Sequence, residues 1–334
     1  MKRISLQTKP RGFTLHLLLP LLVGVMLSIV SMEPPSAQAQ KYSDWSTPVN
    51  LGSAINSAFS DLGQAISKDG RSLYFTSNRP GALGGPGDFD MYVSQRPSVD
   101  DPWGTPMNLG PTVNTAFDEG IPALSRDGHL LFFQSKRPGG FGGIDLWVSY
   151  REHTHDDFDW QPAVNLGPGV NSAADDQGPS YFENDENGER EEGAPQLYFA
   201  SRRPGGFGGV DIYVSAQMAD GSFGPAVLVT ELCTPLNETF PSILHDGLEI
   251  FFNSNRVGTI GAGDLWAATR ESALDAWSTP VNLGNTVNTS FQEQMPYLSS
   301  DRKTLFFSSD RPGGFGGLDL YMSIRTKLRG QSGN

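Results

Sequence analysis

The sequence predicts an all-β protein, a five-bladed β-propeller of four-stranded antiparallel blades. A Trp-led segment recurs along the chain, and this repetition is the first observation behind the prediction. Each copy is followed by short stretches rich in β-branched and aromatic residues, separated by turn residues. Turn formers are abundant throughout, with 39 Gly and 24 Pro among 334 residues. Four short antiparallel strands repeated in this way are typical of a propeller.

The repeat has a constant order of parts. A Trp-Ser-Thr-Pro-Val-Asn-Leu-Gly type segment leads to an Asn-containing loop, then a short strand that ends at a Ser-x-Asp-Gly turn. An aromatic strand, a Gly-rich loop and a second aromatic strand follow, and the Asp-Gly turn is a strong hairpin signal. The copies start near residues 45, 103, 160, 223 and 277, the fourth being a weaker copy led by Phe223. They predict one propeller domain over residues 40–334.

The two ends of the repeat array are out of phase. The segment at 45–51 has no blade in front of it, and the last copy stops after 320–324 without a Trp segment of its own. We therefore expect the N-terminal segment to complete the last blade as its outer strand, which closes the ring and protects the sheet edges.

Residues 1–39 have the features of a secretory signal peptide. A basic start is followed by an apolar run over 13–32 and by the small residues of Ala37-Gln-Ala39. We expect cleavage after Ala39, a periplasmic or secreted location, and no membrane insertion of the mature chain. A retained membrane anchor is the alternative, because the apolar run is long enough to span a bilayer.

The charge of the chain limits its partners. With 24 basic and 37 acidic residues, the formal net charge is −13, which argues against nucleic acid and anionic lipid as ligands. Cations or basic partners fit better. Cys233 is the single cysteine, so no internal disulfide can form, and we expect a buried apolar residue there rather than a nucleophile. The protein is expected to be a monomer.

Two recurring runs resemble a known family. Ser-x-Arg-Pro-Gly-Gly-Phe-Gly-Gly-x-Asp-Leu-Tyr and Leu-Ser-x-Asp-Gly-x-x-Leu-Phe-Phe are similar to the WD40-like β-propeller repeats of the TolB type, over about residues 45–326. The resemblance implies a propeller and a setting in the bacterial cell envelope. It does not imply one activity, because the family scaffolds binding and, in some relatives, chemistry on sugars.

Each repeat carries a carboxylate three residues before the Pro, or in the first repeat before Gln64, that opens the inner strand. These residues are Asp61, Glu119, Asp176, Glu238 and Glu293. Because the inner strand of a propeller borders the central channel, we expect them to ring its mouth on the face that carries the long loops. Loops of this kind are where function usually lies.

Two further charged positions recur in all five repeats. An Arg follows the second strand, and an Asp follows the Gly-rich loop: Arg79, Arg137, Arg203, Arg256 and Arg311, then Asp90, Asp145, Asp211, Asp264 and Asp319. One interpretation is that the ring acids, these Arg and these Asp form ion pairs between blades and set the register of the ring. The other is that some of the carboxylates bind Ca²⁺ through oxygen ligands. Repetition in every blade favours the structural interpretation.

The remaining motifs carry less information. The Gly-rich loops lack the Lys-Ser/Thr pair of a phosphate loop, and their Phe141, Phe207 and Phe315 either pack on the adjacent blade or stack on sugar rings. The 153–157 segment is a local cluster of metal-ligand types without a second cluster to complete it. An acidic insertion at 183–193 is expected to be a solvated loop. No Gly-x-Ser-x-Gly nucleophile motif occurs.

Without a catalytic constellation, the leading hypothesis is a non-enzymatic envelope protein, with no cofactor, that binds a protein, peptide or glycan. Its ligand is expected on the long-loop face near the central channel. The alternative is a carbohydrate-active enzyme, a glycosidase or lyase, that uses two of the channel-mouth carboxylates Glu119, Asp176, Glu238 and Glu293. A purely structural envelope component is the third hypothesis.

Overall fold

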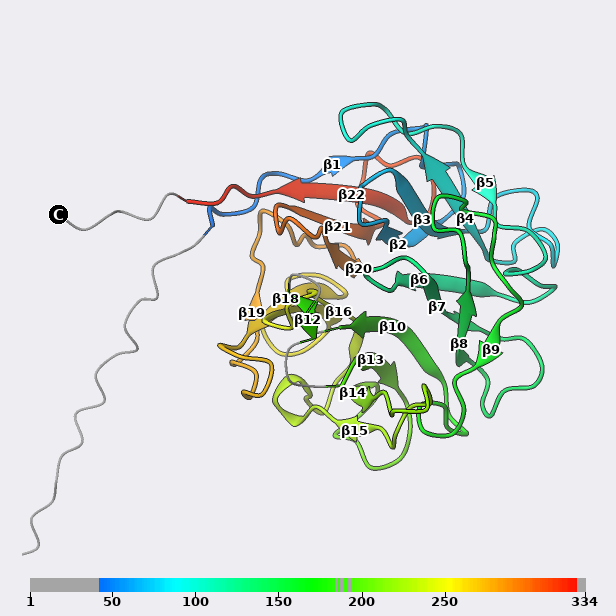
Figure 1. Ribbon diagram of the computed structural model, residues 1–334. Coiled ribbons are helices and arrows are strands. Elements are labelled where there is room, and N and C mark those ends of the chain that lie inside the picture. Colours follow the sequence, from blue (N-terminus) through cyan, green and yellow to red (C-terminus); the bar gives the residue numbers. More distant parts are fainter. Residues whose placement is uncertain (1–41, 184, 187–188, 191–193, 329–334) are drawn as a thin grey trace, which may run out of the picture. The chain divides into compact units, whose positions relative to one another are not determined.

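The computed structural model describes residues 42–183, 185–186, 189–190 and 194–328. The expected signal peptide at 1–39 lies outside these residues. Five sheets of four antiparallel strands stand around a common axis, so the predicted five-bladed propeller is confirmed (Figure 1). In the described part of the chain, no helix is long and apolar enough to cross a membrane.

Every blade takes three long strands from one repeat and a short outer strand from the start of the next. From the axis outward, the first blade consists of β2 (Asp61–Ile66), β3 (Ser72–Ser77), β4 (Asp90–Gln95) and β5 (Met107–Asn108). The second consists of β6 (Glu119–Leu124), β7 (Leu130–Ser135), β8 (Asp145–Tyr150) and β9 (Val164–Asn165). The third consists of β10 (Asp176–Phe182), β13 (Gln196–Ser201), β14 (Asp211–Ala216) and β15 (Val227–Leu228). The fourth consists of β16 (Glu238–Ile243), β17 (Glu249–Ser254), β18 (Asp264–Thr269) and β19 (Val281–Asn282), preceded by the 3-10 turn η1 (Thr230–Leu232).

The fifth blade closes the ring as the sequence predicts. Its strands are β20 (Glu293–Leu298), β21 (Thr304–Ser309), β22 (Asp319–Ile324) and, from the other end of the chain, β1 (Val49–Asn50). The antiparallel register pairs Val49 with Met322 and Asn50 with Tyr321. Figure 1 shows the blue β1 lying beside the red β22.

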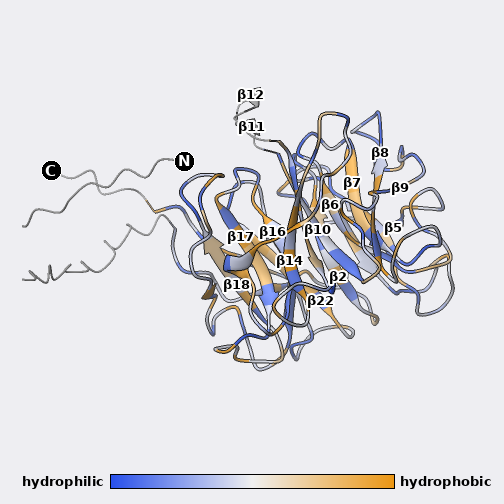
Figure 2. Cartoon of the chain, turned by 90° about the horizontal axis from the view of Figure 1, so that it is seen from below, coloured by the Kyte–Doolittle hydropathy of each residue, from blue (hydrophilic) through white to orange (hydrophobic). Residues whose placement is uncertain are grey.

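The outer strands are held by stacked Arg and Trp side chains, which explains why a Trp leads the repeat. The guanidinium carbon lies 4.1 Å from the Trp103 ring centre for Arg96 and 4.4 Å from that of Trp160 for Arg151. The same contact recurs between Arg270 and Trp277 at 4.2 Å and between Arg325 and Trp45 at 4.5 Å. Each Trp thereby gains a cation–π contact in addition to its packing. Apolar side chains of neighbouring blades pack together, as Tyr74 and Val93 of the first blade do with Leu131 and Trp147 of the second. Figure 2 shows hydrophobic residues along the strands.

All five inner strands are irregular at their third residue. The register shifts there, and the backbone has a positive φ of 50–61° at Gly63, Ile121, Gly178, Phe240 and Met295. This conformation is rare for residues other than Gly, above all for a β-branched one, and such strain concentrates at functional sites. The side chains of Ile121, Phe240 and Met295 belong to one apolar cluster, which plugs the channel. A Cβ on Gly178 would lie 2.8 Å from Cδ1 of Phe240, so glycine makes room for the plug.

The two faces of the propeller carry different connections. We call the face with the Gly-rich loops the loop face. We call the opposite face the turn face. There each inner strand is joined to the second strand of its blade, by the turns at 67–71, 125–129, 244–248 and 299–303 and by the 183–195 connection. The acidic insertion, expected as a loop, contains a short hairpin of β11 (Asp185–Glu186) and β12 (Glu189–Arg190) that projects from the turn face (Figure 2).

Candidate functional site

The five ring acids are buried at the first residue of each inner strand, with exposed fractions of 0–1%. The structure brings each acid together with the Arg of its own repeat. The N···O distances are 2.6 Å for Asp61–Arg79, 3.3 Å for Glu119–Arg137, 2.6 Å for Asp176–Arg203, 3.2 Å for Glu238–Arg256 and 3.0 Å for Glu293–Arg311. The predicted pairing between blades is therefore wrong, because both partners belong to one blade.

These ion pairs tie each blade to the connection that enters it. Arg311 Nη2 also donates to the Val287 carbonyl at 2.7 Å, and Arg79 Nη2 donates to the Ile55 carbonyl at 2.6 Å. The acid accepts from the same connection, as Glu293 does from the Thr289 hydroxyl at 2.6 Å. The contacts recur in the other blades.

The ring acids point into their own blades, where each pairs with the Arg of its repeat, and none is more than 1% exposed. This corrects the expectation of a carboxylate ring at the channel mouth. Burial raises the pKa of Glu119 despite hydrogen bonds from Ser135 and Thr115 and the charge of Arg137. The five acids are thus enclosed, and each is hydrogen-bonded by its own blade and by the connection that enters it.

The second set of acids holds the Gly-rich loops. Asp145 accepts from the backbone N–H of Phe141 at 2.5 Å and of Gly142 at 3.0 Å, and from Asn165 Nδ2 at 3.0 Å. Asp90, Asp211, Asp264 and Asp319 accept from their own loops in the same way. No ion pair to these five acids occurs among the residues that the structure describes. The predicted network of ring acid, Arg and Asp is therefore wrong. The ring acid pairs with the Arg, and the Asp separately accepts hydrogen bonds from the Gly-rich loop.

The third blade departs from this arrangement. Its outer strand has Leu228 at the place of the capping Asn, and Cys233 stands where the other connections have a buried Asn. Asp211, Cys233 and Glu238 place one ligand atom each within 4.8 Å of one another, while Arg256 pairs with Glu238. Burial raises the pKa of the Cys233 thiol to about 12. Binding of Ca²⁺ by any of the repeated acids stays a prediction.

The 153–157 cluster is divided by the fold. The ring of His153 is exposed and lies 2.8 Å from the Asp159 carboxylate, whereas Asp157 is buried against the first blade. Asp157 accepts hydrogen bonds from Ser72, Gln95 and Arg151, and also from Tyr74. The segment therefore connects two blades.

The Gly-rich loops lie on the neighbouring blade. A Cβ on Gly142 would meet the Ala174 carbonyl oxygen at 2.2 Å, so the loop needs glycine for this close approach. The phenylalanines at the loop tips, Phe141, Phe207 and Phe315, are about half exposed, at 50–52%. They are neither buried between blades nor part of the axial pocket.

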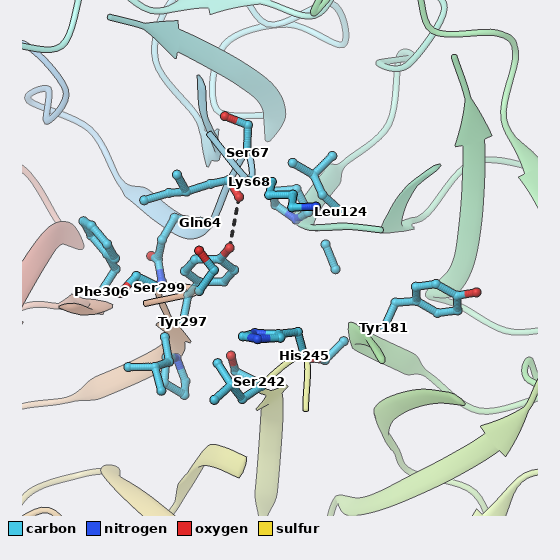
Figure 3. Close-up of a pocket in the computed structure, with 18 of the residues that line it drawn as sticks. Gln64, Ser67, Lys68, Leu124, Tyr181, Ser242, His245, Tyr297, Ser299 and Phe306 are labelled. Carbon is cyan, nitrogen blue, oxygen red and sulfur yellow. Dashed lines mark hydrogen bonds between the residues drawn. The ribbon is translucent and has the colours of Figure 1, made fainter. Parts of the chain in front are cut away.

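A pocket of about 870 Å³ opens along the axis on the turn face (Figure 3). It reaches from the plug residues Ile121, Phe240 and Met295 up to the turns at the ends of the inner strands. This volume is within the range of ligand sites. The ligand was expected on the loop face, whereas this pocket lies on the turn face. The short turns end at the rim and leave the space between the inner strands open, whereas the Gly-rich loops cover their neighbours.

One side of the pocket wall breaks the five-fold pattern. Four inner strands present Pro122, Pro179, Pro241 and Pro296 to the pocket, and the first presents Gln64. Gln64 is only 4% exposed, and its Nε2 donates to the Met295 carbonyl at 2.7 Å. Its Oε1 has no hydrogen-bond partner among the described residues. The pocket therefore contains a buried acceptor whose orientation is set by the amide nitrogen.

The aromatic side chains of the wall are fixed in different directions. The Tyr297 hydroxyl donates to the Ile66 carbonyl at 3.0 Å across the boundary between the last and first blades, and Figure 3 shows this bond. The Tyr181 ring points away from the pocket centre, and its hydroxyl donates to Gln217 at 3.0 Å.

The rim of the pocket is formed by the second residue of each turn. These equivalent positions hold Lys68, Arg126, Glu183, His245 and Ser300. The neighbouring Asp69 and Asp301 also line the pocket, but both accept hydrogen bonds within their own turns. Sequence reasoning missed the rim, although its signal was present in the variable residue of the Ser-x-Asp-Gly pattern. Gln64 had a signal as well, because it replaces a repeated Pro.

Comparisons with known proteins give structural matches alone. No protein-family model and no curated protein sequence matches the chain. An alpha-L-arabinofuranosidase from Lactobacillus brevis superposes with a TM-score of 0.55 at 13% identity, covering 83% of this chain and 93% of the other. A thermostable family-43 glycoside hydrolase gives 0.51 at 13% identity, covering 83% and 91%. TolB from Acinetobacter baumannii aligns over 80% of this chain and 55% of its own, at 12% identity with a TM-score of 0.42, too low to support an argument.

The leading hypothesis of a non-enzymatic binding protein is corrected by these comparisons. Four of the similar solved structures with a TM-score of at least 0.50 are glycoside hydrolases, and two of these are alpha-L-arabinofuranosidases. They favour the alternative, a carbohydrate-active enzyme, over the binding protein that the sequence analysis preferred. At such low identity the likeness establishes the fold alone.

Proposed function

We propose that this chain is a carbohydrate-active enzyme that cleaves a glycosidic bond in the turn-face pocket. The observation that carries the proposal is the axial pocket itself, whose wall and rim break the five-fold symmetry with polar groups at Gln64 and at the second turn residues. An apolar floor with a few convergent polar groups is the usual form of a small-molecule site. The similarity in fold to an alpha-L-arabinofuranosidase and to a family-43 glycoside hydrolase supports a sugar as the ligand.

Glu183 and His245 are the groups we propose for proton transfer. Cleavage of a glycosidic bond needs one group that protonates the leaving oxygen and another that activates the attacking water. Among the described carboxylates of the pocket, Asp69 and Asp301 accept hydrogen bonds within their own turns. Glu183 stands outside the Asp-Gly pattern, and its Oε2 accepts from the backbone N–H of Arg126 in the neighbouring blade at 3.2 Å. His245 projects into the space between the inner strands (Figure 3). Because the ring acids are enclosed, the pair that the sequence suggested among them is not part of this proposal.

The test is an activity screen followed by substitution. The purified chain is incubated with arabinoxylan, xylan oligosaccharides and acidic plant and bacterial polysaccharides, and new sugar ends are measured. With the substrate that is cleaved, Glu183→Gln and His245→Gln should each lower kcat by a factor of about 100 or more. The matched controls are Glu152→Gln and His155→Gln, which change exposed residues of the same types outside the pocket. Equal activity in all four variants would refute the assigned roles.

We further infer that the repeats are of the WD40-like TolB type and that the protein acts outside the cytoplasm. The recurring Ser-x-Arg-Pro-Gly-Gly-Phe run and the signal-like residues 1–39 support this inference. Sequencing the N-terminus of the protein recovered from a bacterial periplasm or culture medium tests it. A new N-terminus at Gln40 is expected, and a chain retained in the cytoplasm with Met1 in place would contradict export.

A further inference from the structure

The rim of the turn-face pocket differs in charge from the rest of the molecule. The whole chain has a net charge of −13, but the five equivalent rim positions hold two permanent cations, Lys68 and Arg126, and one carboxylate, Glu183. The other carboxylates that line the pocket are engaged within their turns, where Asp69 accepts from Ser67 Oγ at 2.6 Å. These hydrogen bonds leave Asp69 and Asp301 charged, so with Arg96 the pocket lining carries three cations and three carboxylates. A rim without net charge repels an anionic ligand less than the acidic surface of the rest of the protein does.

Arg126 lacks the partners that the repeated arginines of this fold have. Arg79, Arg137 and their equivalents each bond a carboxylate and a carbonyl, and Arg96 donates to the Gly70 carbonyl at 2.8 Å. The Nη1 atom of Arg126 is buried and has no hydrogen-bond partner among the described residues. A buried guanidinium nitrogen without an acceptor costs free energy, and a bound carboxylate would satisfy it.

The second unsatisfied group of the pocket, Gln64 Oε1, needs a hydrogen-bond donor, whereas Arg126 Nη1 needs an acceptor. Gln64 Oε1 is an acceptor, because the amide nitrogen is committed to the Met295 carbonyl at 2.7 Å. A hydroxyl group can donate to it, whereas a carboxylate cannot. A ligand that satisfies Arg126 and Gln64 together carries both an anionic group and hydroxyl groups.

We propose that the turn-face pocket selects a saccharide that contains a uronic acid, with the sugar carboxylate held by Arg126 and Lys68 and a hydroxyl donating to Gln64. The inference rests on the proposed function for the identity of the site and adds the class of substrate. Planar guanidinium groups match carboxylates with two parallel hydrogen bonds, which makes the carboxylate of a sugar acid the fitting partner for Arg126.

The test compares sugars that differ in charge alone. Binding of galacturonate and glucuronate oligosaccharides to the full chain is measured by calorimetry, beside the same oligosaccharides after reduction of their carboxyl groups. The acidic forms of at least one oligosaccharide should bind at least about tenfold more tightly at low salt, and the advantage should shrink as salt is added. Tighter binding of a sulfated oligosaccharide than of every uronate would overturn the assignment to a carboxylate.

Variants locate the effect. Arg126→Gln and Lys68→Gln should each lose most of the preference for the acidic form, while affinity for the reduced form changes little. Arg71→Gln and Arg202→Gln remove the same charge from exposed residues that do not line the pocket, and they should keep the preference. Thermal unfolding of each variant shows that the fold is retained. If the controls lose the preference equally, the effect comes from net charge and the proposed site is wrong.

The outcome separates this inference from the proposed function. Selective binding of uronates without cleavage of any glycan would uphold the inference and overturn the enzymatic proposal. Cleavage of neutral glycans by a chain that binds the acidic and the reduced oligosaccharides equally well would uphold the enzymatic proposal and overturn the inference.

Discussion

Asn56 is bonded to both backbone groups of Leu320, a residue at the other end of the chain. Its Nδ2 donates to the Leu320 carbonyl at 3.0 Å, and its Oδ1 accepts from the Leu320 N–H at 2.8 Å. Asn114, Asn171 and Asn288 make the same pair of bonds within continuous stretches of the chain. At Asn56 the same contact joins the first repeat to the last, so one local motif supports both the blades and their closure.

The closure predicts a large effect of small changes at the N-terminal segment. Asn56→Ala should lower the free energy of unfolding by about 2–4 kcal/mol, because the buried N–H and C=O of Leu320 lose their partners. Deletion of residues 40–52 removes β1 and should lower the Tm of the whole ring. Chemical denaturation and thermal scans measure these effects. Asn285→Ala, a change at an exposed Asn, is the control and should leave stability unchanged. An unchanged Tm after the deletion would contradict closure by this segment.

The intra-blade ion pairs predict a strong dependence on both partners. Arg311→Met leaves Glu293 buried beside Thr289 and Ser309 without its cation, and should cost about 3–5 kcal/mol of unfolding free energy. Urea unfolding monitored by Trp fluorescence measures the loss. Arg202→Met removes an exposed Arg next to a pair member and is expected to cost little. If Arg311→Met lowers the free energy of unfolding by less than about 1 kcal/mol, these ion pairs are no stronger than exposed surface pairs and the prediction is wrong.

Asp157 predicts loss of stability in acid. Burial acts to raise the pKa of its carboxyl, but hydrogen bonds from Ser72, Tyr74, Arg151 and Gln95 outweigh it and hold the pKa below its ordinary value. The ionised form is thus favoured in the folded state. The stabilisation is fully present above the unfolded pKa of about 4 and is lost as pH falls through the lower folded pKa.

Substitution of Asp157 should therefore flatten the acid side of the stability profile. Unfolding free energies of the wild type and Asp157→Asn are compared from pH 6 to pH 3. The variant should be less stable at pH 6, and the gap should narrow towards pH 3. His155→Gln, in the same segment but exposed, serves as the control. A constant gap across this range would show that the charge of Asp157 is not the cause.

Substitution of Gln64 is expected to lower activity while the fold is retained. Gln64→Leu removes the buried acceptor and should reduce kcat/KM for the cleaved glycan by a factor of about 10–100. The bond from Nε2 to the Met295 carbonyl is also lost, so a stability decrease of about 1 kcal/mol is expected. Gln161→Leu, at an exposed position outside the pocket, should do neither. Unchanged kinetics in Gln64→Leu would remove this side chain from the site.

Cys233 predicts slow thiol chemistry. Because burial raises the pKa of its thiol to about 12, very little thiolate is present at pH 8. Alkylation by iodoacetamide should be slow in the native protein and fast after denaturation in urea, as followed by mass spectrometry. Rapid labelling of the native chain would show that the thiol is accessible and reactive.

The positions of Asp61 and Glu119 show where sequence reasoning stops. Their offset from the following strand identified them as repeated and placed them at the start of the inner strands, as the structure has them. Whether their side chains face the channel or the blade depends on the Arg and the connection that surround them. The Arg partner lies 18 residues or more from its acid in sequence. The position of an acid relative to the following strand does not give the direction of its side chain.

The sequence by itself determined the blade number, the order of strands and the closure of the ring, because these follow from local periodicity, turn residues and the phase of the repeats at the two ends. Only the tertiary structure decided that the pocket lies on the turn face and that Lys68, Arg126 and His245 share its rim. Each of these residues belongs to a different blade, and each turn alone is an ordinary Asp-Gly turn. Their common surroundings exist only once the ring has closed and the plug has filled the channel below them.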